Sequence, residues 1–152
     1  MPQVRAPHLA PKSIIDRFVA EHADFIDERR KRIKLMAALE SRESACKAEA
    51  ARLLPQLADY YGALMGVKAS YIKITSAKTR FGSCNPQNGI CFSWRLMLYD
   101  RRAVEYVVVH ELAHIKQKNH SAAFYAEINK VMPDYKRRRE LLRLPAECAA
   151  NN

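Results

Sequence analysis

Three histidines and a glutamate stand at a spacing that suits metal-assisted hydrolysis. Residues 110–114 read H-E-L-A-H, and a third histidine follows at position 120. Residues four apart in a helix lie on one face, one turn apart, so the imidazoles of His110 and His114 can point at one shared ion. Glu111 lies about 100° further round the helix, where its carboxylate can take a proton from an attacking water rather than bind the ion. The pattern predicts two metal ligands and a general base.

A catalytic zinc normally has three protein ligands and an open fourth position. His120 is the best candidate for the third ligand, because Lys118 and Asn119 suit the end of a helix and a turn there can bring the chain back. Three imidazoles suit Zn²⁺, which is the predicted cofactor. A lone histidine on an apolar helix is more often a core residue, but this combination of spacing and glutamate is much rarer.

The elements that must position these residues follow from the apolar pattern. A buried helix is predicted to begin after Asp100, a natural N-cap, and to carry the histidines. Alternation at 71–74 predicts a strand, and the turn-forming residues 85–89, which follow 81–84, predict that the apolar run at 90–96 is a returning strand. Two or three antiparallel strands are therefore predicted ahead of the helix. Ser121 can cap a following helix.

Further helices are predicted on either side of these elements. One pattern starts at Ser13, and another covers 41–64, where Pro55 should kink or divide the helix. Pro133 stops the helix after Ser121, and a basic helix runs from Asp134 to near residue 144. The expected fold class is α+β, with N-terminal helices, a small antiparallel sheet packed on the histidine helix, and C-terminal helices. We expect residues 1–12 to form an arm, 13–144 a single domain and 145–152 a tail.

Composition and charge limit the kinds of partner and the cellular location that we expect. The chain has 152 residues, 49% of them hydrophobic, and a formal net charge of +10. Basic runs at 29–32 and 136–139 make non-specific nucleic-acid binding conceivable, although a solvated helix face explains such runs as well. No apolar stretch approaches the roughly 20 residues of a membrane span. The N-terminus lacks the apolar run of a signal peptide, and none of the four cysteines forms a C-x-x-C pair, so a cytoplasmic location is expected.

Several motifs occur along the chain in the same order as in a known family. They are F-G-S-C at 81–84, S-W-R-L at 93–96, Y-V-V-V-H-E-L-A-H at 106–114, N-H-S-x-x-F-Y at 119–125 and M-P-D-Y at 132–135. Together they resemble the YgjP-like metallopeptidase family, also called DUF45, which is grouped with the SprT-like and WLM zinc peptidases. The resemblance covers about residues 14–144. The family usually has tryptophan at the positions of Phe81 and Tyr125, and usually carries additional strands ahead of the segment that begins here near Val4.

The resemblance implies a zincin-like fold and an intracellular bacterial or archaeal protein. It implies zinc ligands at His110, His114 and His120, with Glu111 as general base. The predicted function is therefore zinc-dependent hydrolysis of a peptide bond in a peptide or protein substrate. An extended substrate is expected at a strand edge near 90–96.

An oxyanion donor is also needed in that mechanism, and Tyr125 and Arg95 are the candidates, although packing and surface roles are the commoner ones for such residues.

Three other functions remain open. The same water could attack a phosphoanhydride of a nucleoside triphosphate, with Lys78 and Arg80 as phosphate contacts, although no phosphate-cradling glycine loop is present. The chain could also be a basic nucleic-acid-binding module with a structural zinc, or a protease acting on DNA-bound proteins by analogy with the SprT and WLM groups.

Overall fold

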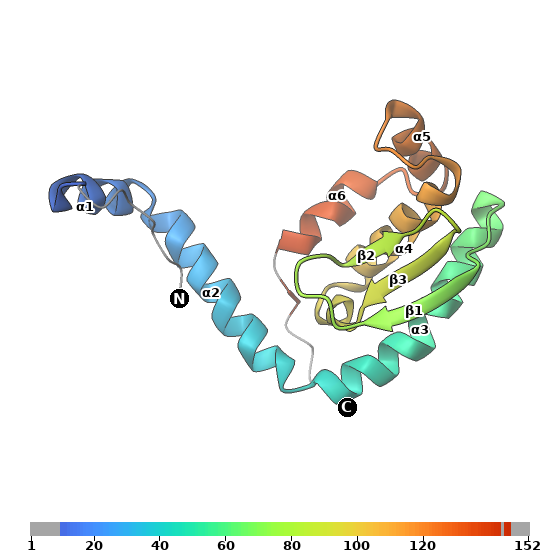
Figure 1. Cartoon of the computed structure of the whole chain (residues 1–152), viewed down its shortest axis with the longest axis horizontal. Helices are drawn as coiled ribbons and strands as arrows, with labels where there is room; N and C mark the ends of the chain where they lie inside the picture. The colour runs from blue at the N-terminus through green and yellow to red at the C-terminus, as the bar shows by residue number, and fades with distance from the viewer. Residues whose placement is uncertain (1–9, 144, 147–152) are drawn as a thin grey trace. The chain divides into compact units, whose positions relative to one another are not determined.

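Figure 1 shows the computed structural model, which describes residues 10–143 and 145–146. The chain divides into two compact units, Met1–Ser41 and Arg42–Asn152. In the first unit, α1 (Lys12–Glu21) and α2 (Ala23–Glu40) are the N-terminal helices that the sequence predicts. Most of the predicted arm, 1–12, and most of the predicted tail, 145–152, lie outside the described residues. The predicted domain bounds of 13 and 144 stay a prediction.

The second unit holds the sheet and the histidine helix. Its elements are α3 (Glu43–Met65), β1 (Tyr71–Thr75), β2 (Gly82–Cys84), β3 (Gly89–Ser93), the 3₁₀ turn η1 (Trp94–Leu98), α4 (Arg101–Lys116), α5 (Ala122–Val131), α6 (Tyr135–Glu140) and the 3₁₀ turn η2 (Leu141–Arg143). Helices α3 and α4 lie behind the sheet in Figure 1 and pack on each other. The core between them is fully buried and includes Leu54, Phe92, Trp94, Val108 and Leu112. The α+β class is confirmed.

The sheet is mixed rather than wholly antiparallel. Its strand order is β1-β3-β2, with β2 antiparallel to β3 but β1 parallel to β3. Strand β3, which carries the fully buried Ile90 and Phe92, is the central strand, and both of its edges are paired. The chain between β1 and β2 therefore passes the end of β3, where the Ser93 hydroxyl donates to the carbonyl of Ala77 at 2.7 Å. The expected substrate edge near 90–96 is wrong, because β3 is the central strand.

The helix boundaries follow local chemistry. The Asp100 carboxylate accepts a hydrogen bond from the backbone N–H of Arg102 at 2.8 Å, which confirms the predicted cap of α4. The Ser121 hydroxyl accepts from the backbone N–H of Phe124 at 3.4 Å and caps α5. Helix α3 runs undivided through Pro55, since Leu54 and Leu57 beside the proline are buried and hold the helix in place. Among the described residues, no helix is both long enough and apolar enough to cross a membrane.

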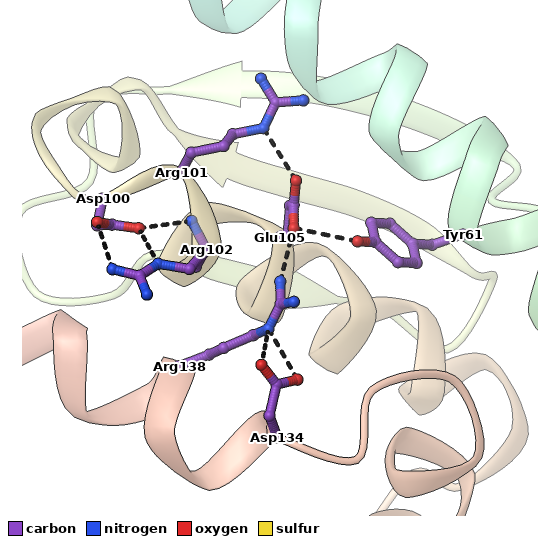
Figure 2. Close-up of polar contacts among 7 residues, drawn as sticks. All are labelled: Tyr61, Asp100, Arg101, Arg102, Glu105, Asp134 and Arg138. Carbon is purple, nitrogen blue, oxygen red and sulfur yellow. Dashed lines mark hydrogen bonds and ion pairs between the residues drawn. The ribbon is translucent and has the colours of Figure 1, made fainter.

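A network of charged side chains fixes α6 against α4 (Figure 2). The guanidinium of Arg138 donates to the carboxylate of Glu105 at 2.6 Å and also pairs with Asp134 at 2.9 Å. The hydroxyl of Tyr61, on α3, donates to the same Glu105 carboxylate at 3.1 Å. The side chains of Arg138 and Glu105 are each only 20% exposed, and such half-buried pairs are screened less by solvent than surface pairs. The six-residue helix α6 is thus tied to the helix that carries the histidines.

Candidate metal centre

The structure brings the three predicted histidines to one point. His110 and His114 stand one turn apart on α4, with ring centroids 5.0 Å apart. His120 joins them from the loop after α4, its centroid 5.1 Å from His110 and 4.7 Å from His114. One nitrogen from each ring lies within 4.8 Å of the others. The loop thus returns His120 to the helix face that carries the other two rings.

The spacing of the nitrogens fits a single small cation. The Nε2 atoms of His110 and His120 are 3.1 Å apart. Two nitrogens bound tetrahedrally to zinc at about 2.0–2.1 Å would be separated by about 3.4 Å. The separation of these two atoms is therefore within a few tenths of an ångström of that expected for two ligands of one zinc ion.

The second nitrogen of each helix histidine has its own partner. His114 Nδ1 lies 3.0 Å from the carbonyl of Gln117, a geometry in which Nδ1–H donates and Nε2 keeps its lone pair. His110 Nδ1 lies 3.3 Å from the hydroxyl of Tyr106. Metal-binding histidines almost always make such a second contact, which sets ring orientation and tautomer. Both contacts leave Nε2 facing the shared point.

Burial keeps these imidazoles neutral. It lowers the pKa of His110 to about 3, and the neighbouring imidazoles and Arg139 act in the same direction. Burial also lowers the pKa of His114. Neutral imidazole is the form that binds a metal, so His110 and His114 need not lose a proton when a metal ion binds at neutral pH.

The ring of Phe124 contacts all three imidazole rings. Its ring centroid lies 4.9 Å from His110, 4.5 Å from His114 and 4.9 Å from His120. Phe124 is fully buried at the start of α5, so it forms an apolar floor for the site. Such a floor restricts ring rotation and excludes water from one side.

Glu111 packs against the edge strand β2. Its side chain is buried, and a Cβ added to Gly82 would lie 2.8 Å from Glu111 Cγ and 2.9 Å from Oε1. Only glycine at position 82 therefore leaves the carboxylate where it is. Burial raises the pKa of Glu111 to about 7, while the positive charge of Arg80 opposes the rise. A pKa near neutrality is the range in which a carboxylate serves best as a general base.

The loop that carries His120 is anchored on the β2–β3 turn. The ammonium of Lys118 donates to Asn88 Oδ1 at 2.7 Å and to the carbonyl of Asn85 at 3.3 Å. Asn88 has a φ of 63°, a left-handed conformation that asparagine tolerates better than most residues. The turn and the loop are therefore held together beside the histidines.

Comparison with known proteins identifies the family of the chain and a solved structure of similar fold. A family model described as the YgjP-like metallopeptidase domain matches residues 37–144. The chain belongs to the YgjP-like metallopeptidase family. The solved metallopeptidase zymogen of Pyrococcus abyssi abylysin is similar in fold, with 21% identity and a TM-score of 0.54 over 59% of this chain and 91% of that one. A comparison with curated proteins gave no match.

The two predicted oxyanion donors lie in different surroundings in this YgjP-like domain. Tyr125 is half-buried beside the histidines, its ring centroid 6.5 Å from that of His120. Arg95 is buried, stacks 4.6 Å above Trp94 and donates to the carbonyl of Ser76 at 2.6 Å. Its guanidinium is turned to the loop after β1.

Several residues of the YgjP-like site were not predicted from the sequence. Tyr106 stands four residues before His110, and this helical spacing was a usable signal for a side chain that contacts the ring. Gly82 and Phe124 had no such signal, because their contacts with Glu111 and the histidines are made between separate elements. Tyr135 stacks between Tyr125 and Tyr106, with centroids 5.8 and 6.4 Å away, and links α6 to the site.

Proposed function

We propose that the domain is a zinc-dependent peptidase in which His110, His114 and His120 hold the ion and Glu111 is the general base. The observation that carries the proposal is the convergence of three imidazole nitrogens within 4.8 Å of one another, next to a buried carboxylate that contacts β2. Three neutral imidazoles are a ligand set of catalytic zinc sites, which keep one position open. Membership of a metallopeptidase family supports the same chemistry.

A bound zinc ion supplies a Lewis acid that polarises a carbonyl and makes water more acidic. A side chain of the protein transfers the protons. Glu111 accepts one from the attacking water and passes it to the leaving amine, two transfers that its pKa of about 7 favours at neutral pH. Tyr106 and Gln117 orient the imidazoles, and Phe124 keeps the floor dry. Tyr125, beside His120, is the candidate donor to the developing oxyanion, whereas Arg95 already donates to Ser76.

The edge strand β2 offers a place for an extended peptide. It pairs with β3 on one side and lies at the end of the sheet order, next to α4. A peptide that adds to such an edge gains backbone hydrogen bonds independent of its side chains. On β2 it would lie beside Gly82, and so beside the carboxylate of Glu111.

Replacing Glu111 with glutamine tests the proposal. E111Q should bind zinc as tightly as the native protein and lose about 10²–10⁴-fold in kcat on an unfolded protein or peptide substrate. A chelator should abolish hydrolysis and zinc should restore it. Hydrolysis at the native rate by E111Q would contradict the proposal. Nucleoside triphosphates assayed in parallel test the alternative, since turnover of nucleotides but not peptides would favour phosphoanhydride hydrolysis.

A further inference from the structure

Two exposed arginines, Arg80 and Arg139, lie on elements that flank the metal centre. Arg80 and Arg139 make no hydrogen bond or ion pair within the part of the chain that the structure describes. Other arginines of this unit, Arg101, Arg102 and Arg138, are each paired with a carboxylate. Unpaired guanidinium groups next to a substrate site are available to bind a substrate anion.

Arg139 lies on α6, on the helix face that is turned toward the site. It stands four residues after Tyr135, and in a helix this spacing puts both on one face. Tyr135 stacks on Tyr106 with the ring planes 15° apart, and the hydroxyl of Tyr106 contacts His110. After burial and the neighbouring imidazoles, the charge of Arg139 contributes to the lowered pKa of His110. The face that carries Arg139 is thus turned toward His110.

Helix α6, which carries Arg139, is held in a fixed position. The pair between Arg138 and Glu105, drawn in Figure 2, ties the helix to α4 immediately before Arg139. Asp134 holds the same guanidinium from the start of α6. A cation on an anchored element loses less conformational freedom on binding than one on a mobile loop, so its contribution to selectivity is larger.

Arg80 approaches from the sheet side. It precedes Gly82 by two residues, and Gly82 packs on Glu111. Its charge opposes the effect of burial on the pKa of Glu111. Arg80, Gly82 and Ser93 also line a cavity of about 220 Å³ at this end of the sheet. One arginine therefore lies toward Glu111 and the other toward His110.

We infer that Arg80 and Arg139 make the site selective for peptides with acidic side chains flanking the bond to be cleaved. The inference rests on the proposed peptidase function and names its substrate class. A guanidinium binds a carboxylate through two parallel hydrogen bonds, which add direction to the charge attraction. Lysine or arginine at the same substrate positions would meet a like charge and be disfavoured.

Binding to E111Q tests the inference separately from turnover. The probes are fluorescein-labelled octapeptides, identical except for glutamate, glutamine or lysine at single scanned positions, titrated with zinc-loaded E111Q and followed by fluorescence anisotropy. We expect the best glutamate peptide to bind about threefold to tenfold more tightly than its lysine counterpart, since exposed ion pairs are weak but bidentate ones are stronger. Adding R139E or R80E should reverse the preference at the positions that each arginine serves.

The chain offers matched controls for both charge reversals. Arg137 is also exposed on α6 but lines a cavity with Arg102 and Leu141 instead. Lys78 is exposed in the same loop as Arg80 and lies near Glu43 of α3. R137E and K78E should leave the glutamate preference within about twofold, because these exposed side chains lie beside other parts of the surface and salt screens the interaction of exposed charges.

Each outcome decides a separate point. Equal binding of the glutamate and lysine peptides, or an equal effect of R137E and R139E, would overturn the inference. If the native protein hydrolyses peptides with no charge preference, the inference fails and the proposed function stands. If E111Q binds acidic peptides selectively but the native protein cleaves none, the anion site stands and the peptidase function fails. Tight binding of inorganic pyrophosphate without binding of acidic peptides would assign the arginines to phosphates and overturn the inference.

Discussion

Gly82→Ala should disable the general base while leaving the metal site intact. The added Cβ would lie 2.8 Å from Glu111 Cγ and 2.9 Å from Oε1. Comfortable contact between carbon atoms begins at about 3.5 Å, so the carboxylate arm must move by about 0.7 Å. A misplacement of about 1 Å in a catalytic group can cost about 10²-fold. We therefore expect a loss of about 10- to 100-fold in kcat.

The assay should separate this loss from unfolding and from metal loss. Hydrolysis of a peptide gives kcat, competition with a chromophoric chelator gives zinc affinity, and thermal denaturation gives Tm. In G82A, kcat should fall while zinc affinity stays within about twofold, because Glu111 is not a ligand in the proposed site. Ser83→Ala is the matched control, since neighbouring residues of a strand point to opposite faces. If G82A keeps native kcat, or loses zinc as strongly as activity, the assigned position of Glu111 is wrong.

Three further predictions test the surroundings of the site. Tyr106→Phe removes the hydroxyl beside His110 Nδ1 and should weaken zinc binding by about 10-fold or more, whereas Tyr61→Phe, which loses only its contact with Glu105, should not. Phe124→Ala should lower the free energy of unfolding by about 3–5 kcal/mol, measured by denaturant titration, and Phe124→Leu by less. In the metal-free protein, the pKa of Glu111 is raised by burial from 4.5 to about 7, so the folded state holds the extra proton and stability falls as pH rises through that window. E111Q lacks this loss. Its free energy of unfolding, relative to that of the native protein, should rise from near zero below pH 4.5 to about 3 kcal/mol above pH 7. A difference in the free energy of unfolding that is independent of pH would contradict the burial of Glu111.

Local spacing explains why part of the site was predictable. The i,i+4 rule needs only a helix to bring His110 and His114 together, and Asp100 marks where that helix begins. His120 required the chain to turn back after Lys116, and family motifs supported this more than periodicity did. The second contact of His110 with Tyr106 follows the same helical rule and could have been predicted.

Long-range packing explains what was missed. Alternation identifies β1 and β3 as strands but carries no information on strand order, so the parallel pairing of β1 with β3 was not expected. That order depends on contacts such as the bond from Ser93 to Ala77, made between separate elements. The role of Gly82 likewise depends on a helix that begins well after it in the chain. Arg95 had the right chemistry for an oxyanion donor, but the loop carbonyls after β1 bind its guanidinium.

X-ray absorption at the zinc edge, on the native protein and on His120→Ala, tests the central claim most directly. Three imidazoles around one ion predict three nitrogen neighbours at about 2.0–2.1 Å in the native protein, and one fewer in H120A. An unchanged nitrogen shell in H120A, or a carboxylate of Glu111 among the ligands, would contradict the proposed site.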